Sequence, residues 1–387
     1  MSVHNEEAER LREQVREFIE TEAIPREHPS LAHDVAALDA VIRELQEKAR
    51  ERGVYAPQLP KDLGGCGLGW VARAGILEEA GRSFLGPGAL NCAPPDQPNM
   101  INLLQNGTPE QKRRYLMPLV EGRVRSCFAM TEPAPGAGSD PGMLAATAVR
   151  RGDGWVLNGH KWFISGAVGA AFSIVLARAE EGATMFIVDA GTPGYELVRN
   201  IGSMDGYQIG GHGEIRLVDC EVGPDAVLGE VGKGFEYAQA RLEPARLSHC
   251  MRFIGRASRA IEIAQDYALR RRSFGTLLAD LQQVQAMVAD SHIDLHASRL
   301  MTIDCAARLD AGLSVKHESA MTKIFVSEAV YRVADRAVQI MGAVGISEDT
   351  PVSLILRELR PFRIYDGASE LHRATLARRI FKERLRP

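Results

Sequence analysis

The sequence predicts an α+β protein with an N-terminal helical domain, a middle antiparallel β domain and a C-terminal helical bundle. Apolar residues recur at helical spacing in the first third of the chain, and short β-type runs separated by turns replace them after Gly122. From Gly234 onward the helical spacing returns. We therefore expect three domains, with boundaries at residues 1–126, 127–235 and 236–387.

Length, composition and charge exclude several classes of protein. The chain has 387 residues, 45% of them hydrophobic and 25% charged, which is ordinary for a globular protein with a large core. Its formal net charge of -4 gives no reason to expect nucleic acid. No apolar run is long enough to span a bilayer, and the acidic start MSVHNEEAER is unlike a signal peptide. We expect a cytoplasmic protein that binds neither nucleic acid nor membrane.

Two helices are predicted near the N-terminus, because apolar residues recur there every three or four positions between charged ones. These residues are Leu11, Val15, Phe18 and Ile19 in the first helix and Val35, Leu38, Ile42 and Leu45 in the second. A glycine-rich stretch follows from Gln58 to Trp70, and we interpret it as a helix–helix connector because helices flank it. Thr108, Pro109 and Gln111 form a capping box with a proline start, which predicts a further helix.

The middle of the chain carries strand signals. Asp153-Gly154 and Asn158-Gly159 each lie between apolar runs, and such dipeptides are typical of hairpin turns. Further strands are predicted at residues 173–176, 185–188 and 214–217. We expect a small antiparallel sandwich or barrel.

The C-terminal third predicts a helical bundle. Gly342 ends one predicted helix, whose apolar face is formed by Val330, Val333, Ala334, Ala337, Val338 and Met341. Another helical face is formed by Leu281, Val284, Met287 and Val288.

Common motifs for metals, nucleotides and nucleophiles are missing from the sequence. It contains no G-x-G-x-x-G after a strand, no P-loop and no G-x-S-x-G elbow. The six cysteines form no C-x-x-C pair, so neither a zinc site nor a disulfide framework is indicated. His292 and His296 are four residues apart on a predicted helix, but Ile293 stands where a zinc protease needs Glu. A surface or packed pair is the favoured interpretation, and a metal hydrolase is a weak alternative.

The stretch from Arg357 to Arg379 contains the strongest candidate for a catalytic group. Asp366 is followed by Gly367, which is a turn signal, and a helical pattern begins directly afterwards. On local sequence alone, the simpler interpretation is that Asp366 caps this helix.

Several motifs resemble those of the acyl-CoA dehydrogenases, and the resemblance covers nearly the whole chain. IYDGA is similar to the family's IYEGT signature, CFAMTEPAPGAGSD to its YxxTEPGAGSD loop, KWFISG to KxWIT, and YALRRRSFG to Y-x-x-x-R-x-x-F-G. Asp366 in place of Glu, together with Glu370 and His372, resembles the branch of family members ten and eleven. The resemblance implies the same order of helices, sheet and helices.

The resemblance also implies FAD as the cofactor and an acyl-CoA as the substrate. The positions matched to FAD contacts are Phe128, Met130, Thr131, Gly138, Ser139, Phe163, Ile164, Ser165, Arg271, Phe274, Gln282, Gln339, Gly342, Ala343, Ala368 and Glu370. The positions matched to acyl-CoA contacts are Ser139, Glu243, Arg246 and Gly367. In the family the segment around Arg271 reaches FAD of a neighbouring subunit, which implies a homodimer or homotetramer.

Asp366 takes the position of the family's catalytic base. In that role its carboxylate removes the α-proton of the thioester, and the β-hydrogen leaves as hydride to flavin N5. Two other branches of the family place the base at the position of Ala245, which cannot act as one. An electron-transfer flavoprotein is the electron acceptor that the resemblance implies.

Three departures from the family pattern leave alternatives open. Phe163 replaces a Trp, Ala343 replaces a Gly and Ala368 replaces a Thr, which is compatible with a non-catalytic relative that binds FAD or acyl-CoA. Asp366 is also compatible with a flavin enzyme similar to nitroalkane oxidase, which uses Asp as its base.

Overall fold

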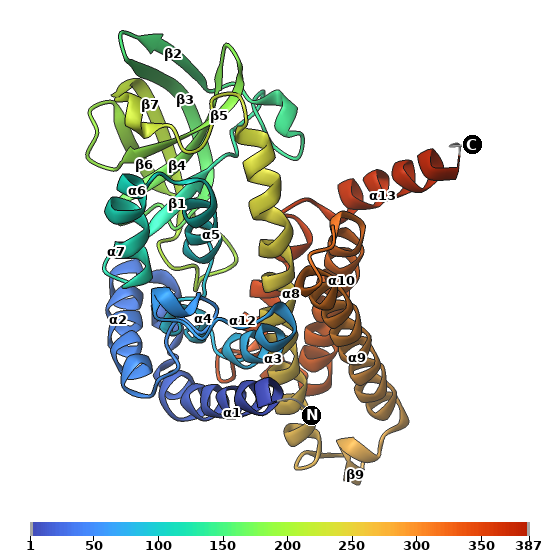
Figure 1. The fold of residues 1–387 in the computed structure, drawn as a ribbon. Helices are drawn as coiled ribbons and strands as arrows, with labels where there is room; N and C mark the ends of the chain where they lie inside the picture. The colour runs from blue at the N-terminus through green and yellow to red at the C-terminus, as the bar shows by residue number, and fades with distance from the viewer. Residues whose placement is uncertain (1–2, 385–387) are drawn as a thin grey trace. The chain divides into compact units, whose positions relative to one another are not determined.

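The computed structural model describes residues 3–384, and the chain divides into two compact units (Figure 1). The first unit contains the chain up to Pro29, the segment Ala49–Leu90 and everything from Arg246 onward. The second unit contains Ser30–Lys48 and Asn91–Ala245. The three domain boundaries expected from the sequence stay a prediction.

The first unit is built from helices. They are α1 (Val3–Phe18), α3 (Trp70–Gly81), α4 (Gly86–Ala89), the part of α8 (Gly234–Ala268) that follows Ala245, α9 (Gln282–Asp310), α10 (Lys316–Met341), α11 (Ala343–Ile346), α12 (Val352–Leu359) and α13 (Ser369–Arg384). A two-stranded hairpin of β8 (Arg272–Ser273) and β9 (Thr276–Leu277) joins α8 to α9. Helices α9 and α10 pack along one another (Figure 1).

The predicted apolar face of α10 is confirmed. Val330, Val333, Ala334 and Ala337 are fully buried. The backbone of Gly342 has a positive φ of 60° and ends the helix, as its sequence position predicts.

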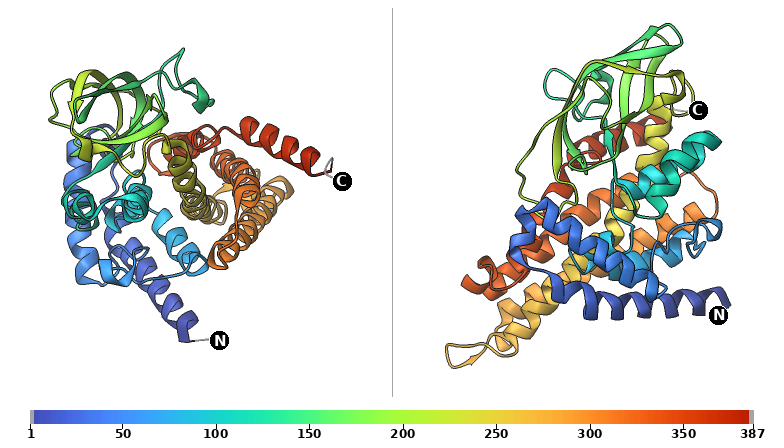
Figure 2. Two further views of the ribbon diagram at one scale, coloured as in Figure 1. Left: turned by 45° about the horizontal axis from the view of Figure 1, so that its top comes forward. Right: turned by 90° about the vertical axis from the view of Figure 1, so that its left-hand side faces the viewer.

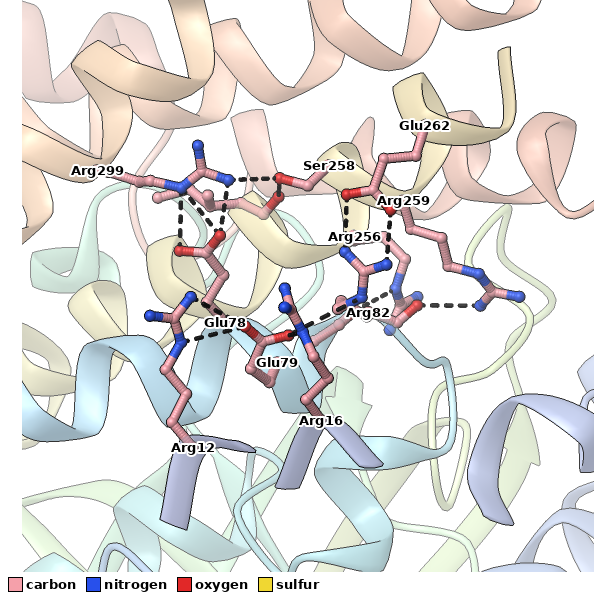
Figure 3. Close-up of polar contacts among 12 residues, drawn as sticks. Arg12, Arg16, Glu78, Glu79, Arg82, Arg256, Ser258, Arg259, Glu262 and Arg299 are labelled. Carbon is pink, nitrogen blue, oxygen red and sulfur yellow. Dashed lines mark hydrogen bonds and ion pairs between the residues drawn. The ribbon is translucent and has the colours of Figure 1, made fainter. Parts of the chain in front are cut away.

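Arginine–glutamate pairs connect the helices of this unit (Figure 3). Glu79 of α3 is 2% exposed, and its carboxylate accepts hydrogen bonds from Arg12 and Arg16 of α1. The neighbouring Glu78 accepts from Arg299 of α9 at 2.8 Å. Because charge-assisted bonds to guanidinium groups are directional, these pairs fix the packing of α3 against α1 and α9.

The second unit combines a seven-stranded sheet with short helices. The strands are β1 (Ser126–Ala129), β2 (Thr147–Arg151), β3 (Gly154–Ser165), β4 (Phe172–Ala179), β5 (Gly182–Asp189), β6 (Tyr195–Asn200) and β7 (His212–Val222). The helices are α2 (Val35–Glu51) as far as Lys48, α5 (Asp96–Asn106), α6 (Pro109–Gln111), α7 (Met117–Val120) and the start of α8. The strand order is β1-β4-β2-β3-β7-β6, with β5 paired to β4, and both views of Figure 2 show a curved sheet.

The sheet is mixed rather than wholly antiparallel. Strand β1 pairs with β4 in parallel, and β2 meets β4 in parallel at Thr147 and Arg178, whereas the other pairs are antiparallel. The parallel pair is possible because a long connection containing the β2–β3 hairpin separates β1 from β4.

One of the two predicted hairpin turns is confirmed and the other is wrong. Gly152 and Asp153 form the turn between β2 and β3, and Gly154 is the first residue of β3. Asn158 and Gly159 instead lie inside β3, where the register against β7 shifts between Leu157 and Gly159. The Asn158 side chain exchanges two hydrogen bonds with Asp219, at 2.8 and 3.2 Å. A bulge uses the same permissive residues as a turn, which is why the dipeptide was misleading.

The helical segment before the sheet begins with the predicted capping box. The Thr108 hydroxyl accepts from the Gln111 backbone N–H at 3.1 Å, and the Gln111 side chain accepts from the Thr108 backbone N–H at 3.0 Å. The ring of Tyr115 in this segment lies 4.8 Å from that of Phe172 in β4, so the segment packs against the sheet.

Candidate active site

Asp366 and Gly367 form a left-handed turn directly before α13. Their φ angles are 54° and 95°, a region that Asp tolerates better than most residues and that favours Gly. A Cβ at position 367 would lie 2.4 Å from Nε2 of His372, so only glycine fits. The turn and the following helix are therefore confirmed.

Three side chains from three helices hold the backbone of this turn. Arg246 of α8 donates from Nε to the Asp366 carbonyl oxygen at 2.9 Å, and His372 of α13 donates from Nε2 to the same oxygen at 3.0 Å. Lys323 of α10 donates from Nζ to the Gly367 carbonyl oxygen at 2.7 Å. Both carbonyls of the turn are thus bonded, which fixes where the Asp366 side chain begins.

The Asp366 carboxylate lies beside the ring of His249 on α8. His249 Nε2 is 3.4 Å from Asp366 Oδ2, and the two side chains are 9% and 20% exposed. The rings of Phe362 and Tyr365 lie 5.7 and 5.1 Å from the His249 ring. The carboxylate is therefore mostly shielded from solvent, beside an imidazole that aromatic rings surround.

Burial shifts the pKa of two groups that support the turn. Burial lowers the pKa of the Lys323 amine to about 8, although the negative charge of Asp366 opposes this change. Burial and the nearby charge of Arg246 lower the pKa of His372 to about 4. His372 is therefore neutral at neutral pH.

In the second unit, a buried ion pair organises the loop from Cys127 to Asp140. Lys161 of β3 is completely buried and donates to Oε1 of Glu132 at 2.7 Å. The Glu132 carboxylate also accepts from the backbone N–H groups of Ala137, Ala145 and Ala146. Burial lowers the pKa of Lys161 to about 8 despite this partner.

The predicted FAD contacts on this loop lie close to the ion pair along the chain. Phe128 is half-buried, and the guanidinium carbon of Arg241 lies over its ring, 4.1 Å from the ring centre. The Met130 carbonyl accepts from Lys161 Nζ at 3.2 Å, and the Thr131 carbonyl accepts from the Trp162 N–H at 3.1 Å. Gly138 and Ser139 are exposed, and an added Cβ at Gly138 would meet no atom within 4 Å.

The end of β3 presents one aromatic ring and one hydroxyl. Phe163 has a φ of 50° and is 48% exposed, whereas the Ile164 side chain is 2% exposed and belongs to the sheet core. Only backbone atoms of Ile164 are thus available for a ligand. The Ser165 hydroxyl lies 3.0 Å from Nδ1 of His212, whose Nε2 lies 3.1 Å from both carboxylate oxygens of Asp205.

The remaining predicted FAD contacts of the first unit lie at its surface. The β8–β9 hairpin carries Phe274, which is 96% exposed and has a φ of 52°. Exposure is shared by Arg271, Gln282, Gln339, Gly342, Ala343 and Glu370, whereas Ala368 is partly exposed. The FAD roles of these residues, and the contact of part of this set with a neighbouring subunit, stay predictions.

Four residues around Asp366 were assigned no role from the sequence. His249, Arg252, Lys323 and His372 contact the turn or one another, and Arg252 lies 3.1 Å from Nδ1 of His249. The sequence singles out His372 only for its resemblance to a family branch. The local signal for His249 and Arg252 is on α8, where Arg246, His249 and Arg252 recur every three residues and so share one face. The predicted acyl-CoA contact Glu243 lies earlier on α8, in the second unit, and is partly buried.

Among residues 3–384, no group of three or more His, Cys, Asp or Glu side chains could hold a metal ion. The Gln265 amide donates from Nε2 to Nε2 of His292 at 2.8 Å, and His292 is exposed, as expected of a surface residue. None of the helices described is both long enough and apolar enough to cross a membrane. All six cysteines are free thiols.

Several known proteins are similar to this chain in sequence or in structure. It is 35% identical to acyl-CoA dehydrogenase family member 10 of Mus musculus over 97% of this chain. It is 34% identical to (R)-benzylsuccinyl-CoA dehydrogenase of Thauera aromatica over 98% of this chain and 96% of that protein. The solved structure of acyl-CoA dehydrogenase from Geobacillus kaustophilus matches with a TM-score of 0.85 and 26% identity, over 97% of this chain and 98% of that one. The chain spans less than half the length of the vertebrate family members ten and eleven that it matches.

Family models for the three parts of one enzyme family match in order along the chain. The acyl-CoA dehydrogenase N-terminal domain matches residues 5–123, the middle domain 127–220 and the C-terminal domain 232–381. The predicted order of helices, sheet and helices is confirmed by this match, and the chain belongs to the acyl-CoA dehydrogenase family.

Proposed function

We propose that this protein catalyses the FAD-dependent α,β-dehydrogenation of an acyl-CoA thioester, with Asp366 as the base that removes the α-proton. The arrangement of cations around Asp366 carries this proposal. Arg246 and Lys323 donate to the backbone carbonyls of the turn, which fixes where the carboxylate begins. The carboxylate is only 20% exposed and has a neighbouring imidazole, which suits a general base.

The fixed backbone of the turn also suits the shorter side chain of Asp. A displacement of about 1 Å can cost on the order of a hundredfold in rate, so a base needs a rigid support. Here the support comes from α8, α10 and α13. The backbone N–H of Asp366 would polarise the thioester carbonyl as negative charge develops on it, as the family resemblance implies.

The residues of the second unit fit a flavin. Phe163 offers an exposed aromatic face, Ser165 offers a hydroxyl, and the loop from Cys127 to Asp140 offers exposed backbone held by Glu132. When bound, FAD supplies the acceptor for the hydride that leaves the β-carbon. Transfer of the electrons to an electron-transfer flavoprotein and assembly into a homodimer or homotetramer are parts of the same proposal.

A direct experiment tests the proposal. The purified protein is expected to be yellow, and an acyl-CoA added without oxygen should bleach the flavin absorbance. Asp366→Asn should retain FAD and lose bleaching, because an amide cannot accept the proton. A colourless protein that cannot be reconstituted with FAD, or an active Asp366→Asn variant, would contradict the assignment.

Because a nitroalkane oxidase-like enzyme also uses Asp as its base, nitroalkane oxidation is a second candidate function. The same preparation distinguishes the two. Rapid reduction by nitroalkanes, with no reduction and no tight binding of acyl-CoA, would favour the oxidase. Binding of FAD and acyl-CoA with no reduction by either substrate class would indicate a non-catalytic relative.

A further inference from the structure

We propose that His249 is a positioning residue for the base: its Nε2–H holds Oδ2 of Asp366, so that Oδ1 is the oxygen that takes the α-proton. This inference rests on the proposed function, because it gives Asp366 the role of the base. It adds a residue to which the sequence assigned no role.

The tautomer of His249 follows from its second neighbour. Nη2 of Arg252 lies 3.1 Å from Nδ1 of His249. A guanidinium group has only donors, so Nδ1 must accept this bond through its lone pair. The hydrogen of the neutral ring is then on Nε2, which faces Oδ2 of Asp366 at 3.4 Å. Hydrogen-bond donation therefore runs in one direction, from Arg252 to His249 and from His249 to Asp366.

The ring of His249 has little freedom to turn away. His249 is 7% exposed and Arg252 is 4% exposed. The rings of Phe253, Phe362 and Tyr365 lie within 5.1 to 5.8 Å of the imidazole. A separation of 3.4 Å is long for a hydrogen bond, and such bonds commonly tighten when substrate binds.

The supports of the turn have separate tasks. Arg246, His372 and Lys323 hold the two backbone carbonyls, whereas His249 faces the side chain itself. Without His249 the backbone would stay in place, but the carboxylate could rotate about its side-chain bonds.

In the proposed step the proton goes to Asp366, and the electron pair of the broken bond stays in the substrate. The α-C–H bond breaks and an O–H bond forms on Oδ1 of Asp366, while the electron pair moves into the new Cα=Cβ bond. FAD, when bound, would supply the acceptor for the hydride that leaves the β-carbon. His249 takes up no proton in this step, because its only lone pair faces the Arg252 guanidinium.

Two variants of His249 separate donation from packing. In His249→Phe the aromatic contacts remain and the donor is lost, whereas in His249→Gln an amide N–H can reach the place of Nε2. We expect anaerobic flavin reduction by acyl-CoA to slow by about tenfold to a hundredfold in the Phe variant, as expected for a mispositioned base. The Gln variant should recover most of the rate. To measure binding without turnover, each substitution is combined with Asp366→Asn, and acyl-CoA binding is monitored by the shift of the flavin spectrum. The affinity should change little with either substitution. His296→Phe, on the exposed surface of α9, serves as the matched control.

A spectroscopic measurement tests the tautomer without turnover. In protein labelled with ¹⁵N-histidine, His249 should give the signals of a neutral ring protonated at Nε2, assigned by their loss in His249→Gln. A ring protonated at Nδ1, or at both nitrogens, at neutral pH would overturn the inference. This measurement also applies if the Phe variant fails to fold.

The outcomes distinguish the inference from the function on which it rests. If the wild-type protein is reduced by acyl-CoA and Asp366→Asn is not, but His249→Phe is as fast as wild type, the positioning role is wrong and the function stands. A Gln variant as slow as the Phe variant would also contradict the donor role. If the wild-type protein is reduced by no acyl-CoA, the proposed function itself fails.

Discussion

Gly367 and His372 are in such close contact that no side chain fits at position 367, because a Cβ there would lie 2.4 Å from Nε2 of His372. The same Nε2 donates to the carbonyl oxygen of Asp366 at 3.0 Å. Because Gly367 has no side chain, His372 can come close enough to bond the backbone of the turn.

Gly367→Ala should therefore damage both stability and activity. A non-glycine residue in such a backbone conformation costs about 1 to 3 kcal/mol, and the contact with His372 adds to this cost. We expect a lower urea midpoint and a large loss of flavin reduction by acyl-CoA. Gly312→Ala is the matched control, because φ is 69° there but an added Cβ meets nothing within 4 Å. Equal effects of the two substitutions on stability would show that the contact with His372 is unimportant.

Asp366→Glu should reduce the rate although most of the family has Glu at this position. Arg246, His372 and Lys323 fix the backbone of the turn, so the longer side chain cannot be accommodated by retreat of the backbone. A displacement of the carboxylate by about 1 Å corresponds to a loss of up to about a hundredfold in the rate of flavin reduction. Stopped-flow reduction with a saturating acyl-CoA measures this effect. A Glu variant as fast as wild type would mean that the turn is mobile.

His372 should make the protein less stable at mildly acidic pH. Its pKa is lowered to about 4 in the folded protein from an ordinary value of 6.5, so between these values the unfolded chain binds more protons. Its contribution is fully present above the unfolded pKa and is lost as the pH falls towards 4. We expect the free energy of unfolding to fall by about 2 kcal/mol between pH 7 and pH 5 through this group.

The variant His372→Gln isolates that contribution. Gln cannot titrate, yet its amide can donate to the Asp366 carbonyl. Urea unfolding at the two pH values should show a smaller decrease in the variant than in the wild type. An identical decrease in both proteins would assign the pH dependence to other groups.

The features that could be predicted from the sequence are those with a local cause. The capping box at Thr108, the end of α10 at Gly342 and the turn at Gly367 each depend on the conformational preference of one or two residues. These preferences act before tertiary structure forms, and neighbouring residues are enough to recognise them.

The features that could not be predicted depend on partners distant in the chain. Asn158-Gly159 became a bulge rather than a turn because β3 continues along β7, where Asp219 bonds the Asn158 side chain. The role of Lys323 depends on the packing of α10 near the turn, 44 residues away in sequence. The FAD and acyl-CoA roles of the candidate residues stay predictions, since they concern bound molecules.

Lys161 and Glu132 provide a test of how the loop from Cys127 to Asp140 is held. Lys161→Met removes one partner of a buried pair and leaves the Glu132 carboxylate without its cation, a change that typically costs about 3 to 5 kcal/mol. Because Glu132 also fixes three backbone N–H groups around the loop, we expect weaker retention of FAD as well as a lower urea midpoint.

Two further variants identify the cause of that loss. In Lys161→Met/Glu132→Gln no charge is left unpaired, so the double variant should recover part of the stability lost in the single one. Arg151→Met removes an exposed partner of Glu221 in the same sheet and should change the free energy of unfolding by less than about 1 kcal/mol. If Lys161→Met behaved like Arg151→Met and kept its FAD, the ion pair would have no part in shaping the loop.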